Sequence, residues 1–179
     1  VASAATSQLI FNESAKVNTQ VTGANLLMGK PADYNAVRYI HLQLAKDSVN
    51  TDDIIVRFAN NAVTTYDPAV DGKYQPGFGV VSLASLSSDN VPLAINVQPF
   101  PKTKATIPLS ATASADGSYQ FQMKGIVGVP QLFNIWLVDN YTKDSVDMRE
   151  NPIYTFVISH ADTNSSSATR FKLVLAQNP

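Results

Sequence analysis

The part of this sequence with the most chemically active side chains is DNYTKDSVDMRENPIYTFVISH, residues 139–160, which holds three Asp, one Glu, one Lys, one Arg and one His. Pairs of carboxylates, or a carboxylate beside a histidine, are the groups that general acid–base catalysis uses. However, Asn151 precedes Pro152, and a residue before proline avoids the helical region, so an extended segment should start here. We therefore interpret the stretch as a strand that ends at Asp139, a polar connection with a short returning strand at VDM, and a further strand.

Neither of the two histidines meets the requirements of a catalytic base in its local sequence. His41 lies on a predicted strand beside Tyr39 and Gln43, with no orienting carboxylate or nucleophile next to it in the chain. His160 follows a strand and precedes Asp162, so SHADTN could bind a metal, but a histidine in a solvated loop is the interpretation that we prefer. Cysteine is absent, which excludes thiol catalysis, Cys-based zinc sites and disulfides. No phosphate loop, nucleophile elbow or zinc-protease motif occurs, so we expect no enzyme.

The loop TYDPAVDGKYQPGFG carries the candidate metal ligands. Asp67 and Asp71, with Asp89 further along, are oxygen donors near a glycine turn, and Ca²⁺ binds six to eight oxygens. The spacing differs from that of an EF-hand, and Asp before Pro or Gly is also ordinary turn chemistry. Calcium at Asp67 and Asp71 is therefore one hypothesis, and a loop without any cofactor is the alternative.

The aromatic side chains suggest a different kind of site. Trp136 alternates with Phe133, Ile135 and Leu137 in FNIWLVD, so it falls on the opposite face of that strand. On an open face, Trp136 would be a platform for stacking sugars, with Tyr141 close by in the following loop. The alternative is that Trp136 belongs to the core of a second layer or lies under a loop.

Composition excludes some partners. The formal net charge is -1 and Lys and Arg form no cluster, whereas nucleic-acid binding needs a basic stripe. No apolar run approaches the length of a membrane span, so we expect no membrane insertion. Charged residues make up only 15% of the chain, a low share that is common in exported β-proteins. The chain begins VASAATSQLI without Met, from which we expect a processed protein or an excised fragment.

A period of two dominates the chain and predicts an all-β fold. In SYQFQMK, for example, Tyr119, Phe121 and Met123 face one way and polar residues face the other, as in a half-buried antiparallel strand. Turn residues such as those in SSDN, ADGS and ENP separate the runs. We therefore predict an antiparallel β-sandwich, jelly-roll-like or Ig-like, of about eight to ten strands. The main runs are 37–44, 53–58, 93–98, 105–112, 118–124, 133–139, 153–159 and 170–176.

The length of 179 residues suits a single domain over 1–179. The proline-rich segment VQPFPKTK, residues 97–104, is the one point at which the chain could divide into two smaller sandwiches. We expect it to be a loop within one domain, because each half would be short for a sandwich of its own.

The last third of the chain resembles a β-sandwich module of Bacteroidetes surface and secreted proteins, of the kind found next to type IX secretion sorting domains. The similarity covers roughly residues 37–176 and extends upstream through TDDIIVRFANNAVTTYDPAVDGKYQ. In the C-terminal third, the matching positions are Leu137, Asp139, Asp147, Met148, Asn151, Tyr154, Thr155, Phe156, Arg170, Phe171 and Leu173. The chain departs from that arrangement because it stops at LAQNP, without a sorting domain.

This resemblance implies an extracellular or cell-surface location and, as partners, other modules of the same parent protein or a surface glycan. It supplies no catalytic residues. The Asp-Ser-Val triplets at 47–49 and 144–146 resemble an O-glycosylation site, which makes Ser48 and Ser145 candidates. Two functions follow as expectations: a non-catalytic structural or adhesive module of an exported bacterial surface protein, or a carbohydrate-binding module of a secreted polysaccharide-degrading enzyme.

Overall fold

The computed structural model describes residues 37–77, 79–167 and 169–178. Within these residues the fold is all-β, with eleven strands and no helix. The first six strands are β1 (Arg38–Ala45), β2 (Thr51–Phe58), β3 (Gly72–Lys73), β4 (Val81–Leu86), β5 (Pro92–Gln98) and β6 (Lys104–Ala113). The remaining strands are β7 (Gly117–Val127), β8 (Phe133–Asp139), β9 (Asp144–Asp147), β10 (Ile153–Ile158) and β11 (Phe171–Gln177).

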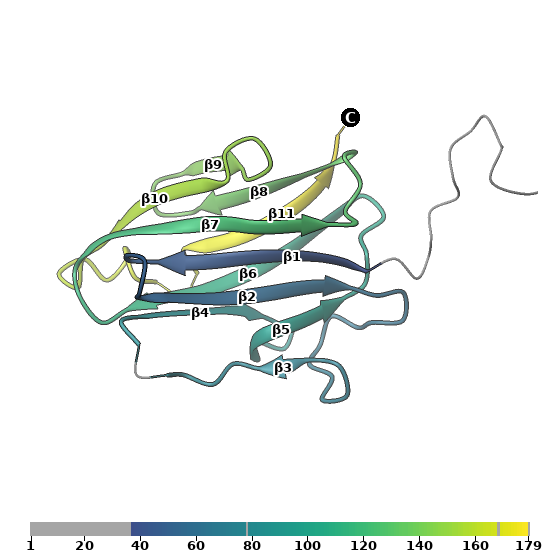
Figure 1. Ribbon diagram of the computed structural model, residues 1–179, viewed down its shortest axis with the longest axis horizontal. Coiled ribbons are helices and arrows are strands. Elements are labelled where there is room, and N and C mark those ends of the chain that lie inside the picture. The colour runs from purple at the N-terminus through teal and green to yellow at the C-terminus, as the bar shows by residue number, and fades with distance from the viewer. Residues whose placement is uncertain (1–36, 78, 168, 179) are drawn as a thin grey trace, which may run out of the picture. The chain divides into compact units, whose positions relative to one another are not determined.

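The strands form one hydrogen-bonded sheet in the order β10-β7-β1-β2-β5-β4-β6-β11-β8-β9, and β3 pairs with β5 (Figure 1). This corrects the prediction of a purely antiparallel sheet, because β2 and β5 run parallel, with Ile55 opposite Ile95. A parallel pair needs a long crossover connection. Residues 59–91 provide it and carry β3 and β4, and the sequence analysis had missed both of these strands.

The sheet curls so that its edge strand β10 comes close to the other end of the sheet at β8 and β9 (Figure 1). The hydroxyl of Tyr154 in β10 donates to the carboxylate of Asp139 at the end of β8 over 3.1 Å. Only residues 148–152 link β9 to β10. We call this junction of β8, β9 and β10 the seam. The stretch 139–160 supplies the last residue of β8 and all of β9 and β10 to the seam.

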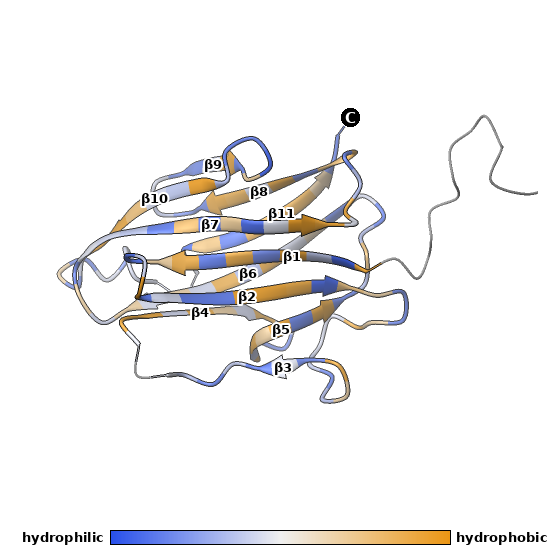
Figure 2. Cartoon of the chain, viewed as in Figure 1, coloured by the Kyte–Doolittle hydropathy of each residue, from blue (hydrophilic) through white to orange (hydrophobic). Residues whose placement is uncertain are grey.

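The core is the inner face of this curled sheet. Along most strands alternating residues point inward, which Figure 2 shows as alternating orange and blue bands, whereas β4 and β5 each bury three residues in succession. In β8, for example, Phe133, Ile135 and Leu137 are buried, whereas Asn134 and Trp136 on the outer face are half-buried. The largest fully buried side chains are Tyr119, Phe121, Ile40, Leu42, Leu44, Ile54, Leu83, Leu93, Ile107, Leu109, Ile135 and Leu137.

The proline-rich segment at 97–104 connects β5 to β6 within the sheet. Its Phe100 ring packs edge-on against Phe58, with centroids 5.4 Å apart, and against Phe133, with centroids 5.1 Å apart. Edge-to-face packing of this kind adds to the burial of the rings. The described residues belong to one compact unit, 34–179.

Candidate functional site

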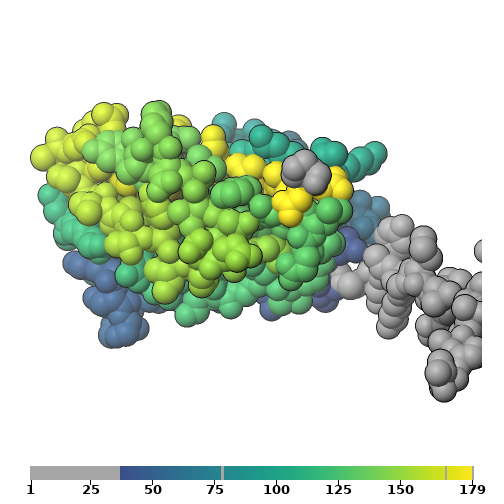
Figure 3. Space-filling view, turned by 90° about the horizontal axis from the view of Figure 1, so that it is seen from above, coloured from purple at the N-terminus to yellow at the C-terminus, as the bar shows by residue number. Residues whose placement is uncertain are grey.

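Trp136 lies on the outer face of β8, where it is half-buried. It stands opposite Val174 of β11 and opposite Asp147 of β9. It lines a surface depression of about 660 Å³ between β8, β9 and the link to β10. The depression is lined by Asn134, Trp136, Ser145, Val146, Asp147, Glu150, Asn151 and Ile153. Figure 3 views the molecule from the seam side, where residues of 140–160 in yellow-green form much of the surface.

This Trp136 depression combines an aromatic face with polar groups, as small-ligand sites do. Ile153 is 55% exposed and adds an apolar wall. Asn134 and Asn151 each bring an amide that can both donate and accept hydrogen bonds. An indole flanked by amides and carboxylates suits the apolar ring face and the hydroxyl edge of a sugar.

Tyr141, the second aromatic candidate, lies elsewhere. Its ring stacks on the Arg170 guanidinium, 4.8 Å from the ring centroid, and its hydroxyl donates to Asp162 over 2.7 Å. It lines a separate depression of about 270 Å³ with Lys143 and Asn164. One face of the ring is therefore occupied by protein, and the structure does not bring Tyr141 together with Trp136.

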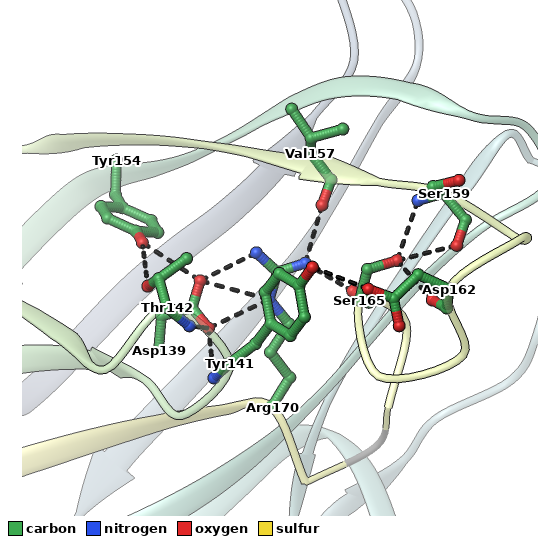
Figure 4. Close-up of polar contacts among 9 residues, drawn as sticks. All are labelled: Asp139, Tyr141, Thr142, Tyr154, Val157, Ser159, Asp162, Ser165 and Arg170. Carbon is green, nitrogen blue, oxygen red and sulfur yellow. Dashed lines mark hydrogen bonds and ion pairs between the residues drawn. The ribbon is translucent and has the colours of Figure 1, made fainter.

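Arg170 and Asp139 form a buried ion pair behind Tyr141 (Figure 4). The side chains are only 2% and 1% exposed, and Arg170 Nη2 lies 2.8 Å from Asp139 Oδ2. Arg170 also donates from Nη1 to the carbonyl oxygens of Val157 and Ser165. We call this arrangement the Arg170 lock, since it joins β8, β10, β11 and the loop between β10 and β11.

Asp139 is fully supplied with donors in this lock. Its Oδ1 accepts from the backbone amide of Tyr141 at 2.9 Å and its Oδ2 from the Tyr154 hydroxyl. Burial alone would raise the pKa of the Asp139 carboxyl, but the Arg170 guanidinium and backbone amides outweigh it and hold the pKa below its ordinary value. Asp139 therefore stays ionised and acts as a fixed anion for Arg170.

His160 forms a second carboxylate pair with a residue from the β6–β7 turn. Its Nδ1 lies 2.5 Å from Asp116 Oδ1, and its Nε2 lies 3.2 Å from the carbonyl oxygen of Ala113. The hydrogen bond to Asp116 is the main cause that raises the pKa of His160, and the His160 amide is the main cause that lowers the pKa of Asp116. The nearby Ser159 Oγ donates to Asp116 over 3.3 Å rather than to the imidazole.

His41 also has a carboxylate partner, which the local sequence did not reveal. Asp53 Oδ2 lies 2.5 Å from His41 Nε2. The two residues come from the adjacent strands β1 and β2, where Gln43 is opposite Asp53. The hairpin register was the signal that would have found this pair, because it places Asp53 diagonally across from His41.

The calcium candidates Asp67 and Asp71 lie next to each other and bind backbone amides. Asp71 accepts from Asp67 N at 2.8 Å and from Val97 N at 2.7 Å, so it fastens the loop to β5. Asp89 accepts from Tyr66 N at 3.0 Å. In the described part of the chain, no group of three or more His, Cys, Asp or Glu side chains is placed to hold a metal ion. Calcium binding at this loop stays a prediction.

The two candidate O-glycosylation residues are both exposed. Ser48 lies in the β1–β2 turn, and Ser145 lies in β9 at the border of the Trp136 depression.

The sequence pattern did not predict Asn134, Glu150 and Asn151 as neighbours of Trp136. They meet only because β9 turns back on β8 and the link 148–152 follows.

The fold and the site define an all-β domain with one curled mixed sheet, a buried Arg170 lock and an aromatic surface depression. The chain matches the family described as "Domain of unknown function (DUF8693)" over residues 1–175, and it belongs to that family. No curated protein matches the chain, and no solved structure does. Among the described residues, no helix has the length and apolar character to cross a membrane.

Proposed function

We propose that this domain is a non-catalytic module of an exported bacterial cell-surface protein, with a structural or adhesive role beside other modules of its parent protein. The main supporting observation is that Asp139, the first acid of the stretch 139–160, binds Arg170 and the Tyr154 hydroxyl and so fastens the seam. Charged side chains that stabilise a sheet in this way serve architecture. The low share of charged residues, 15%, and the resemblance to Bacteroidetes surface modules support export.

The arrangement around His160 supports a role without catalysis. A nucleophilic serine needs a hydrogen bond to the base, and the base needs the carboxylate behind it. Here Ser159 donates to Asp116, and the two imidazole nitrogens face Asp116 and the Ala113 carbonyl. Ser159 and His160 therefore both bind Asp116, and these hydrogen bonds join the segment after β10 to the β6–β7 turn. We call this contact the His160–Asp116 clasp.

The proposal includes a β-sandwich arrangement, jelly-roll-like or Ig-like, for the curled sheet. Phe121 of β7 and Phe171 of β11 come from distant positions in the strand order, yet their ring centroids are 4.9 Å apart. Opposed halves that share one core are the arrangement of sandwich modules in many cell-surface proteins.

Surface location can be tested with antibodies raised against this domain. Intact cells of the source organism should bind them, and external protease should remove the signal. Permeabilised cells provide the control for antibody access. Staining only after permeabilisation would contradict the proposal.

A second candidate function, carbohydrate binding, is favoured by the Trp136 depression. The half-buried Trp136 lies on the outer face of β8 and lines the depression together with Asn134 and Asn151. We propose that this is the contact surface for a glycan, in the manner of a carbohydrate-binding module of a polysaccharide-degrading enzyme.

Pull-downs with insoluble polysaccharides and a glycan array test this candidate. The wild-type protein should be retained by at least one glycan, and Trp136→Ala should lose that retention. Tyr141→Ala is the matched aromatic control, because Tyr141 lies in a different depression, and it should keep the binding. Retention that is equal in wild type and Trp136→Ala would remove the depression as the site.

A further inference from the structure

The Trp136 depression is acidic. Asp147 stands directly opposite Trp136 across the β8–β9 pair, and Glu150 lines the same depression from the link to β10. Residues opposite each other in an antiparallel pair have Cβ atoms about 5 Å apart. Asp147 uses Oδ1 to accept the Arg149 amide at 3.0 Å. In the described residues no protein donor to its Oδ2 is present.

Arg149 and Lys172 do not line the depression. Arg149 lies between the two acids in sequence, but its guanidinium donates to the carbonyl oxygens of Phe133, Val129 and Pro130 at 2.8–3.0 Å. Lys172 lies on the same outer face in β11, opposite Val138, one row away from Trp136. The lining therefore carries two carboxylates and no Lys or Arg.

We propose that the Trp136 depression binds glycans built of amino sugars with free amino groups. The inference rests on the proposed carbohydrate-binding function and names the substrate class of that site. The apolar face of one pyranose ring would stack on the indole, and two ammonium groups of the glycan would pair with Asp147 and Glu150. A cation near an indole face is also attracted to the ring itself, and Trp is the best of the aromatic partners for this. Uronic acids would meet like charge in the same place.

The test compares three oligosaccharides of one length with the full 179-residue chain. They are β-1,4-linked glucosamine, its N-acetylated counterpart and α-1,4-linked galacturonate, measured by calorimetry at pH 6 and low salt. Glucosamine should bind about five- to twentyfold more tightly than the N-acetylated oligomer, since two partly exposed ion pairs are worth roughly that factor. The preference should shrink as salt is added. Galacturonate should bind most weakly.

Two variants separate this inference from the function on which it rests. Asp147→Asn combined with Glu150→Gln should abolish the preference for glucosamine and keep binding of the N-acetylated oligomer. Asp144→Asn is the control, because it removes a carboxylate of β9 that does not line the depression, and the preference should persist. Equal binding of both oligomers that is lost in Trp136→Ala would overturn the amino-sugar inference and leave carbohydrate binding standing. Binding of none of the three would overturn the inference and count against the carbohydrate role.

Discussion

Arg170 donates to both carboxylate oxygens of Asp139, with Nε 3.0 and 3.2 Å and Nη2 2.8 Å from them, in a place where both side chains are almost fully buried. The guanidinium also lies 5.0 Å from the Phe156 ring centroid and 4.6 Å from that of Phe171. One cation thereby connects a carboxylate of β8, a ring of β10 and a ring of β11. Such a buried pair is sensitive to the loss of either partner, because the remaining charge is left without compensation.

Replacement of Arg170 by Met should strongly destabilise the domain. The variant leaves the Asp139 carboxylate buried without its cation, and the free energy of unfolding should fall by about 3–5 kcal/mol. Urea unfolding followed by tryptophan fluorescence measures this, since Trp136 is the only Trp in the chain. Lys172→Met, two residues away on the outer face, is the control and should change stability by less than about 0.5 kcal/mol.

The double variant Asp139→Leu with Arg170→Met gives a further check. Its loss of stability should be smaller than the sum of the losses of the two single variants. Each single variant leaves one buried charge without a partner, whereas the double variant removes both charges. Additive losses would show that the two side chains act independently, and would contradict the lock.

Eight strands were predictable from the period-two pattern, because alternating burial is a local property of each strand. The run 133–139, for example, coincides with β8 at both ends. β4 was missed because VSLASL does not alternate: Leu83, Ala84 and Ser85 are buried in succession. The parallel pair of β2 with β5 was missed because strand order depends on contacts between distant segments, which a local pattern does not contain.

The sequence predicted single residues of the candidate site but not which residues lie together. The alternation in FNIWLVD placed Trp136 on the outer face, yet its neighbours come from β9 and from the link 148–152. Asp139 was interpreted as the end of a strand, and Arg170 was noted only as a position of the family-like pattern. Their pairing across thirty-one residues follows from the β8–β11 register, in which Phe171 lies opposite Asp139.

Asp52 should contribute to stability because its carboxylate accepts a hydrogen bond from a β4 backbone amide that no neighbouring strand pairs with. Its Oδ2 accepts from the amide of the buried Leu83 in β4 at 2.8 Å, at a point where β4 is no longer paired with β5. Asp52→Ala would leave that amide without a partner, at a cost of about 1–3 kcal/mol. Asp53→Ala, at the neighbouring exposed position, should cost less. Equal losses in the two variants, measured by urea unfolding, would contradict this role for Asp52.

Gly128 should not tolerate a side chain. Its φ is +65°, and an added Cβ would lie 2.4 Å from the Val37 carbonyl oxygen. Gly128→Ala should therefore lower the free energy of unfolding by at least about 1 kcal/mol, from the left-handed backbone alone. Gly125→Ala is the matched control, because its Cβ would meet only ordinary contacts at 3.8 Å and beyond. The prediction is wrong if both variants unfold at the same urea concentration.

The His160–Asp116 clasp should make stability depend on pH near neutrality. The hydrogen bond that the His160 imidazole makes to the Asp116 carboxylate raises the pKa of His160 above its ordinary 6.5, so the folded state binds the proton more tightly than the unfolded state. This contribution should be fully present below about pH 6.5, the unfolded pKa, and should be lost as the pH rises through the higher folded pKa.

NMR titration of the imidazole gives the pKa of His160, with His41→Gln used to assign the signals of the two histidines. Asp116→Asn should lower the pKa of His160 and weaken the pH dependence of unfolding, because it removes the main cause of the shift. A wild-type His160 that titrates at or below 6.5 would show that the clasp does not hold the proton.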